Sequence, residues 1–267
     1  MISSEKNPHF KRIKALLSAT KARKKDRCFI LETQRSIREA LSRSPRKLRG
    51  LFFSTTSKEQ AILSLIKEAK QQHCPCFELS EVLFKQCHHV KTSCGIIAIV
   101  EQPPIQPIDA KTLLTNAVFL DQINNPKNLG SIIRNAAAFS INSIILSPQC
   151  ADPFHPEAIR ASGSTILSIS LLKSSFQKLC QLHPNLQFWI VDKSGKQTLE
   201  NVQFPSQNLF IFGSEAGFSP NILDSKKPPK FDGLSIPISS TVDSLNVAAA
   251  SSLVFYQHAL SLKAKKG

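Results

Sequence analysis

Hydrophobic residues in the second half of the chain fall into short runs separated by longer mixed segments. The runs lie at 117–120, 143–147, 187–191, 209–212 and 234–238. Each is long enough for a buried strand and too short for a helix. Helical patterns lie between several of the runs, and a strong one closes the chain at 245–262. This alternation predicts a largely parallel sheet with helices on both faces.

The first part of the chain has a mixed pattern typical of a smaller α/β domain. The periodicity predicts helices at 33–43 and 58–72 and strands at 50–54 and 95–100. The boundary between the two patterns is rich in proline, which breaks both helices and strand ladders. We therefore expect an N-terminal domain at 1–104, a proline-rich linker at 105–111 and a larger α/β domain at 112–267.

Positive charge is concentrated near the N-terminus. The chain carries a formal charge of +15, and residues 11–49 alone hold fourteen Lys and Arg against three acids. A solvated helix face usually mixes signs. The excess therefore predicts a phosphate backbone as partner, bound more weakly as salt rises. A membrane surface is the alternative, but the segment has no broad apolar face with Trp or Phe anchors.

Three further features favour a cytoplasmic protein with reduced thiols. The chain has no run of 18 apolar residues, and Met1–Arg12 lacks the apolar core of a secretory signal. Its seven cysteines are an odd number. Cys74-Pro-Cys76 and Cys87-His88-His89, with Cys94 beyond, lack the paired C-x2-C spacing of a structural zinc site. We therefore expect no metal.

The stretch Asn128-Leu-Gly130-Ser-Ile-Ile-Arg134 lies between an expected strand that ends near Asp121 and an amphipathic helix. Asn128 is a favoured N-cap, so the helix is expected to start there. Arg134 would lie over Gly130, because helical side chains lean toward the N-terminus. The guanidinium, the amide and the free helix N–H groups would then hold a polar, anionic substrate. The alternative is an ordinary capped helix with a surface arginine.

Two later segments also begin where apolar runs end. Gly213-Ser-Glu215-Ala-Gly217 follows one run, and its glycines allow the backbone to approach a ligand, before Ser219-Pro220 starts a short helix. The other segment is Ile236-Pro237, followed by a polar loop and Ser244-Leu245-Asn246. Small residues at 248–252 then predict a closely packed helix, with Ser244 as its N-cap.

In this order and spacing, the three segments resemble the SpoU (TrmH-like) branch of the SPOUT RNA methyltransferases. Asn128, Gly130 and Arg134 match its motif N-x-G-x-x-x-R. Ile236-Pro237 and Ser244-Leu-Asn-Val247 match its third motif. The resemblance covers about 112–262, and the N-terminal part is similar to the family's RNA-binding substrate domain. The second motif is one residue shorter than G-x-E-x-x-G-L and looks like the G-P-E-G-G-F of a sister family that methylates uridine bases.

The resemblance implies a deep trefoil knot in the C-terminal domain, a homodimer, and S-adenosylmethionine as the methyl donor. By residue-wise correspondence, the cofactor would contact Gly213, Ile236 and Leu245. Arg134 would act on a ribose 2′-hydroxyl, in a site that is shaped by Asn128, Glu215, Ser244 and Asn246.

The main hypothesis is 2′-O-methylation of a ribose in structured RNA, ribosomal rather than transfer RNA. One alternative is a non-catalytic RNA-binding or ribosome-assembly factor of the same fold, and another is an RNA base methyltransferase. Arginine is a poor base, because its pKa exceeds about 12. Arg134 is therefore either deprotonated in a dry pocket or orients the ribose and its phosphate, and we favour orientation.

Overall fold

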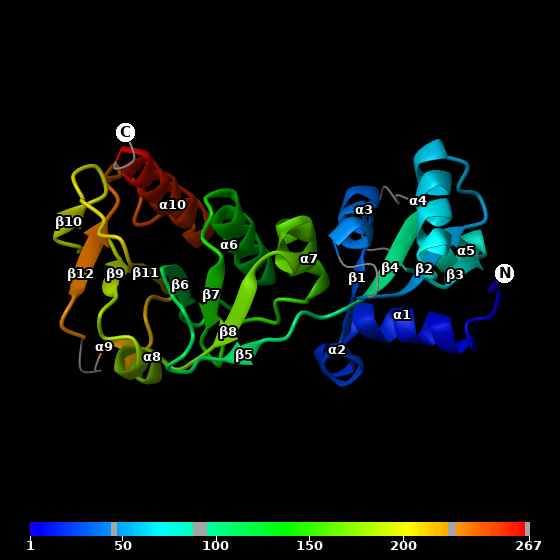
Figure 1. Cartoon of the computed structure of the whole chain (residues 1–267), viewed down its shortest axis with the longest axis horizontal. Coiled ribbons are helices and arrows are strands. Elements are labelled where there is room, and N and C mark those ends of the chain that lie inside the picture. Colours follow the sequence, from blue (N-terminus) through cyan, green and yellow to red (C-terminus); the bar gives the residue numbers. More distant parts are fainter. Residues whose placement is uncertain (44–46, 88–94, 224–227, 265–267) are drawn as a thin grey trace. The chain divides into compact units, whose positions relative to one another are not determined.

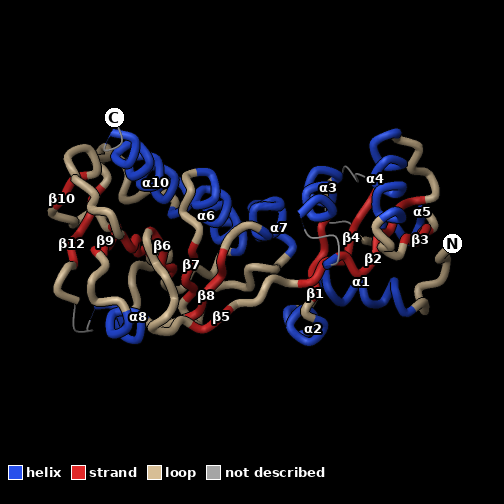
Figure 2. Tube along the Cα trace, in the orientation of Figure 1, coloured by secondary structure: helices blue, strands red, loops and turns tan. Residues whose placement is uncertain are grey.

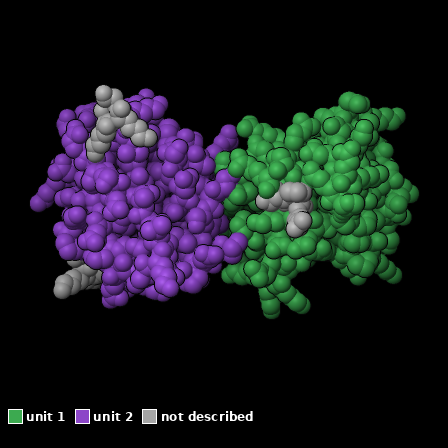
Figure 3. Space-filling view, viewed as in Figure 1, with its two compact units in different colours: residues 1–103, 152–167 green, residues 104–151, 168–267 purple. Residues whose placement is uncertain are grey.

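A computed structural model describes residues 1–43, 47–87, 95–223 and 228–264. His88, His89 and Cys94 of the zinc candidate lie outside these residues. The chain divides into two compact units (Figure 3): unit 1 is residues 1–103 with 152–167, and unit 2 is residues 104–151 with 168–267. Helices alternate with strands in both units (Figure 2).

Unit 1 is built on a four-stranded sheet in the order β1-β4-β2-β3. The strands are β1 (Cys28–Leu31), β2 (Leu48–Ser54), β3 (Cys76–Leu79) and β4 (Ile96–Glu101). Strand β4 is antiparallel to β1 and β2, and β3 is parallel to β2. The helices are α1 (Pro8–Ser18), α2 (Thr20–Asp26), α3 (Gln34–Arg43), α4 (Gln60–Gln71) and α5 (Glu81–Lys85). The four elements expected from the sequence are confirmed as α3, β2, α4 and β4.

Helix α1 is amphipathic and closes the core of unit 1. Phe10, Ile13 and Leu17 recur at helical spacing and are buried, and they join Phe52 and Ile97 from the sheet in one apolar cluster. Asn7 accepts a hydrogen bond from the backbone N–H of His9 at 2.9 Å and caps the helix.

Unit 1 also contains α7 (Pro156–Ser162) and a 3-10 turn, η2 (Gly163–Leu167), which follow the first part of unit 2 in the sequence. The fully buried Arg23 of α2 anchors this segment: its Nε lies 2.8 Å from Asp152 Oδ2. The same guanidinium donates to Leu16 O at 2.8 Å and to Thr20 Oγ1 at 2.9 Å. A second ion pair joins Arg160 Nη1 and Glu32 Oε2 at 3.1 Å.

Unit 2 is built on an eight-stranded sheet in the order β10-β12-β9-β11-β6-β7-β8-β5 (Figure 1), and all of its pairs are parallel. The strands are β5 (Gln106–Pro107), β6 (Asn116–Leu120), β7 (Ser143–Leu146), β8 (Ser170–Lys173), β9 (Gln187–Val191), β10 (Gln197–Thr198), β11 (Asn208–Phe212) and β12 (Phe231–Ser235). The helices are α6 (Pro126–Ala138), α8 (Phe176–Leu182), α9 (Pro220–Leu223) and α10 (Val247–Ala264). The expected parallel α/β sheet is confirmed.

Strand β11 shows why its sequence is apolar at every position after Asn208. Alternate residues point to opposite faces of a sheet. Leu209 and Ile211 join the apolar cluster that contains Leu179 of α8. Phe210 and Phe212 instead contact the ring of Phe255 on α10. Helices therefore cover both faces of this strand.

Three boundary predictions are wrong. Helix α6 begins at Pro126, and Asn125 rather than Asn128 caps it, because Asn125 Oδ1 accepts from the N–H of Lys127 at 2.9 Å while Pro126 fits the first helical position. Helix α10 begins at Val247, and its first turn is capped by Asn246 Oδ1, which accepts from Ala248 N at 2.9 Å, not by Ser244. Strand β12 ends at Ser235 instead of 238, since Pro237 has no N–H to donate.

None of the helices in the described ranges is long and apolar enough to cross a membrane.

Candidate functional site

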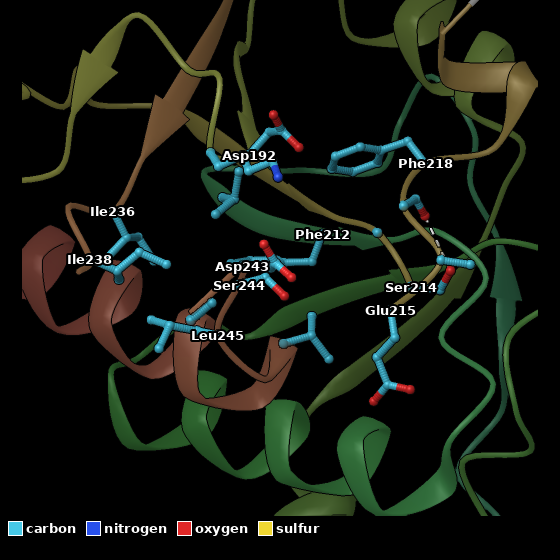
Figure 4. A pocket seen from close by; sticks show the side chains of 17 residues that line it. Asp192, Phe212, Ser214, Glu215, Phe218, Ile236, Ile238, Asp243, Ser244 and Leu245 are labelled. Atoms are coloured by element: carbon cyan, nitrogen blue, oxygen red, sulfur yellow. Dashed lines mark hydrogen bonds between the residues drawn. The ribbon is translucent and has the colours of Figure 1, made fainter. Parts of the chain in front are cut away.

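A cavity of about 650 Å³ lies in unit 2 beyond the carboxyl ends of β9, β11 and β12 (Figure 4). These three strands are neighbours in a parallel sheet, so their following loops meet at one edge, where open α/β sheets bind ligands. The volume is in the range of about 300–1,000 Å³ that is typical of small-molecule sites. The lining comes from Val191–Lys193, Phe212–Phe218, Ile236, Ile238, Asp243–Leu245, Val247 and Ala250.

One part of the cavity wall is apolar. Ile236 and Ile238 follow β12, and Leu245 and Val247 lie at the start of α10. Figure 4 shows Ile236, Ile238 and Leu245 together on one side of the cavity. Such a surface suits a flat, weakly polar group like a nucleobase.

The loop after β11 is a tight turn that brings its backbone to the cavity. Gly217 has φ +93° and donates its N–H to Ser214 O at 2.9 Å, while Ser214 Oγ donates to Gly217 O at 3.1 Å. A Cβ on Gly213 would stand 2.9 Å from Gly217 O. Only glycine therefore fits at 213, and the short second motif closes into a compact turn with Glu215 at its exposed tip.

Three polar side chains from the three singled-out segments form a hydrogen-bonded chain beside the cavity. Asn128 Nδ2 donates to Glu215 Oε1 at 2.8 Å, and Asn246 Nδ2 donates to Asn128 Oδ1 at 3.1 Å. We refer to Asn128, Glu215 and Asn246 as the amide–carboxylate cluster. Because Asn125 caps α6, the side chain of Asn128 is available for this contact. The cluster fixes the direction of the Glu215 carboxylate, which lines the cavity.

A further contact joins the first and second loops. The buried Asp121, which directly follows β6, accepts a hydrogen bond through Oδ2 from the N–H of Ser219 at 2.7 Å. Its own N–H donates to Phe212 O at 2.9 Å. The two loops are therefore held together at both ends of the Gly213 turn.

The structure places the predicted site residues in three groups. Gly213, Glu215, Ile236, Ser244 and Leu245 line the cavity. Asn128 and Asn246 adjoin it through the amide–carboxylate cluster.

Arg134 forms a group of its own. It lies six residues beyond Asn128 on α6, outside the cavity lining, and its side chain is exposed. Within the described part of the chain, no hydrogen bond or ion pair is recorded for it. Its charge is therefore not engaged within unit 2.

Sequence reasoning missed Asp192, Phe218 and Asp243, which also line the cavity. Asp192 carried a usable signal, because it directly follows an apolar run that was expected to be a strand, and parallel strands present ligands at that end. Asp243 lies in an exposed loop with no such marker.

A metal site finds no support among the described residues, where no group of three or more His, Cys, Asp and Glu side chains is placed to hold an ion. Burial raises the pKa of the Cys74 thiol to about 11, and it raises the pKa of the Cys87 thiol to about 11 as well. Both thiols are therefore weakly nucleophilic, since the thiolate is the reactive form.

The parallel sheet and the cavity at its carboxyl edge define an α/β domain with a ligand-binding edge. The sequence profile of the SpoU rRNA Methylase family matches residues 115–256, and that of the MRM3-like substrate binding domain matches residues 7–98. The chain therefore belongs to the SpoU rRNA methylase family. The trefoil knot that this family implies stays a prediction.

Curated relatives match over nearly the whole chain. An uncharacterized tRNA/rRNA methyltransferase of Synechocystis is 29% identical over 96% of this chain and 92% of its own length. The 23S rRNA (guanosine(2553)-2′-O)-methyltransferase RlmP of Bacillus subtilis is 26% identical over 96% of this chain and 97% of its own length.

Solved structures share the fold. The AdoMet-bound rRNA methyltransferase of Sinorhizobium meliloti superposes with a TM-score of 0.81 at 22% identity, covering 96% of this chain and 95% of that one. The SpoU methyltransferase AviRb of Streptomyces viridochromogenes, in complex with AdoMet, has a TM-score of 0.80 at 21% identity, covering 98% and 100%.

Proposed function

We propose that this protein transfers a methyl group from S-adenosylmethionine to the 2′-hydroxyl of a ribose in RNA, ribosomal rather than transfer RNA. The observation that carries the proposal is the amide–carboxylate cluster of Asn128, Glu215 and Asn246 beside the cavity. It brings the three motif segments to one place, at the edge of a cavity of cofactor size. The Bacillus subtilis relative, named as a 2′-O-methyltransferase of 23S rRNA, supports the choice of ribose and RNA.

The cavity fits the proposed methyl donor. Gly213 permits the compact turn that lines the cavity, and Ile236 and Leu245 offer an apolar surface for adenine. S-adenosylmethionine supplies an electrophilic methyl group on a sulfonium when it is bound.

The amide–carboxylate cluster positions the acceptor. Asn128 donates a hydrogen bond to Glu215 Oε1, so the orientation of the carboxylate is set before the substrate binds. A ribose hydroxyl can then donate a hydrogen bond to Glu215 at the mouth of the cavity. Such prior orientation lowers the free-energy barrier of a reaction by several kcal/mol, and by roughly 7–11 kcal/mol in the best cases.

Arg134 orients the RNA in this proposal. Its side chain is exposed rather than enclosed in a dry pocket, which favours the orienting role. A guanidinium in this position can hold the phosphate next to the target ribose.

Two surfaces outside the cavity are suited to contact with partners. Exposed basic side chains of α1 and α2 offer a surface for RNA phosphates: Lys11, Lys14, Lys21, Lys24 and Lys25. Helix α10 presents a stripe of exposed apolar residues, Leu253, Tyr256 and Leu260, which suits contact with a second copy of the chain. We therefore include a homodimer in the proposal.

Methyl transfer to defined RNAs tests the proposal. The protein is incubated with S-adenosylmethionine and unmodified ribosomal or transfer RNA, and the digested nucleosides are analysed by mass spectrometry. We expect one extra methyl on a ribose, from ribosomal RNA only, and none with Asn128→Ala. A methyl on a base would favour the base methyltransferase, and RNA binding without any S-adenosylmethionine binding would favour the non-catalytic factor.

A further inference from the structure

The carboxylate of Asp192 lies on the cavity wall where β9 ends, between the loops that follow β11 and β12. The family motifs do not include this position. Figure 4 shows Asp192 between Phe218 on one side and Ile236 with Ile238 on the other. It is half-buried, in contrast to the exposed Asp243 on the same cavity.

The turn after β9 holds the Asp192 carboxylate in one orientation. Oδ1 accepts from the N–H of Ser194 at 2.9 Å and from Ser194 Oγ at 2.5 Å. The backbone N–H of Asp192 donates to Leu234 O at 3.0 Å. The turn cannot shift easily, because Gly195 is packed on β12 so closely that a Cβ there would stand 2.5 Å from the carbonyl carbon of Leu234.

Both of these side-chain hydrogen bonds use Oδ1 and leave the second oxygen, Oδ2, to be considered. Within the described ranges, Oδ2 accepts no hydrogen bond, and the neighbouring Lys193 forms no ion pair with it. A fixed carboxylate on a cavity wall, with one oxygen open, suits a ligand that donates hydroxyl groups. In nucleotide-binding α/β proteins, an acid near a strand end binds ribose hydroxyls in this way.

We infer that Asp192 binds the ribose 2′- and 3′-hydroxyls of the adenosine half of the methyl donor, an inference that rests on the proposed function. The apolar wall takes the adenine, and the methyl must reach the amide–carboxylate cluster. The ribose joins adenine to the sulfonium, so it lies next to the adenine, and Asp192 lines the same cavity as the apolar wall. Asp192 is thus a residue that selects a ribonucleoside cofactor.

Calorimetry with two cofactor forms separates this role from simple charge attraction. S-adenosylmethionine carries a positive sulfonium, whereas S-adenosylhomocysteine has a neutral thioether and the same ribose. Asp192→Asn keeps an oxygen for Ser194 and replaces the open acceptor by a donor. We expect it to weaken both ligands equally, by about 10- to 100-fold, the range for hydrogen bonds to a charged group. Glu200→Gln, an exposed acid outside the cavity lining, serves as the charge-matched control and should bind like the wild type.

Deoxy analogues locate the contact on the ribose. The 2′-deoxy and 3′-deoxy forms of S-adenosylhomocysteine should bind the wild type more weakly than the parent. For at least one of them, Asp192→Asn should cause no further loss. Unchanged binding by Asp192→Asn, a loss confined to S-adenosylmethionine, or additive losses would each overturn the inference. If the wild type binds neither parent ligand, the proposed function fails as well, so the two failures are distinguishable.

Discussion

Arg134 is exposed on α6, and among the described residues of unit 2 its side chain makes no hydrogen bond or ion pair. Its charge is therefore available to a polyanion, while the cavity and the amide–carboxylate cluster do not depend on it. This separation makes it possible to remove the arginine without disturbing the fold.

Replacing Arg134 tests its role. Arg134→Ala should lower the rate of methyl transfer by at least about 100-fold, because the ribose is no longer oriented. RNA affinity should change by less than about threefold, since one phosphate contact among many is lost. Tritium incorporation and gel-shift titration measure the two effects, with the neighbouring surface variant Lys127→Ala as control. Retained activity would falsify the role of Arg134.

Two buried thiols should make the stability of unit 1 depend on pH. The pKa of Cys74 and that of Cys87 are raised by burial to about 11 in the folded protein, from an ordinary value of 9.0. The unfolded chain therefore loses these protons first, and the stabilisation that is present below pH 9 is lost as the pH rises toward 11. We expect the melting temperature of unit 1 to fall between pH 9 and pH 11, and to fall less in Cys87→Ala.

A thiol reagent offers an independent check on the same groups. At pH 8, both side chains should react far more slowly with a disulfide reagent in the folded protein than in urea, because the thiolate is the reactive form. Fast labelling of Cys87 in the folded state, read by peptide mass spectrometry, would contradict the assigned burial.

At the scale of elements, the buried contact between α2 and the segment at 152–167 controls the integrity of unit 1. Arg23→Ala should lower the free energy of unfolding by about 3–5 kcal/mol, because it leaves Asp152 without its partner in a buried place. Lys24→Ala, exposed on the same helix, should cost less than about 0.5 kcal/mol. Urea unfolding followed by circular dichroism measures both.

The single tryptophan sharpens that experiment. Trp189 lies in β9 of unit 2, so its fluorescence reports that unit. The Arg23 variant should shift the dichroism transition while the fluorescence transition stays close to that of the wild type. A loss below 1 kcal/mol in the dichroism transition would show that the contact is not structural.

Helices, strands and site residues could be predicted from the sequence where the pattern that marks them lies within a few neighbouring residues. Strand β11 is apolar at every position after Asn208, which is typical of a strand covered on both faces, and Gly213 indicates a turn with close backbone contacts. The start of α6 was predicted wrongly because Asn125 and Asn128 are both favoured N-cap residues. Only Pro126, which suits the first helical position, indicates that Asn125 is the cap. Asp192 was missed because no local pattern tells that β9 is placed between β11 and β12. The pairing of Arg23 with Asp152 joins residues 129 positions apart, which no periodicity reveals.

At the scale of the whole molecule, we expect the basic surface of unit 1 to determine how RNA binding responds to salt. The triple variant Lys21→Gln, Lys24→Gln and Lys25→Gln should flatten the slope of log affinity against log salt by up to about 3, since each lysine releases roughly one counterion. Arg23 is left out because it is buried. Three exposed lysines of unit 2, Lys111, Lys178 and Lys230, provide a control with the same change in charge. Equal slopes for both triples would refute a dedicated RNA surface on α2.

Self-association is the second property at this scale. Leu253, Tyr256 and Leu260 on α10 are 44%, 53% and 40% exposed and lie along one face. Leu253→Arg with Leu260→Arg should convert a dimer, of twice the 29.5 kDa chain mass, into a monomer in sedimentation experiments. Val82→Arg, an exposed apolar position of unit 1, should leave the dimer intact. A wild type that sediments as a monomer would remove the dimer from the proposal.

The placement of residues 152–167 in unit 1 has a consequence for how the protein is made. Translation delivers the chain at about 5–20 residues per second. When residue 103 leaves the ribosome, the guanidinium of Arg23 still lacks Asp152, which emerges several seconds later, after β6, α6 and β7. Unit 1, although its synthesis begins first, therefore cannot be completed until residues 104–151 of unit 2 have been translated. Until then the guanidinium of Arg23 lacks its carboxylate partner, and only Leu16 O and Thr20 Oγ1 can accept its hydrogen bonds.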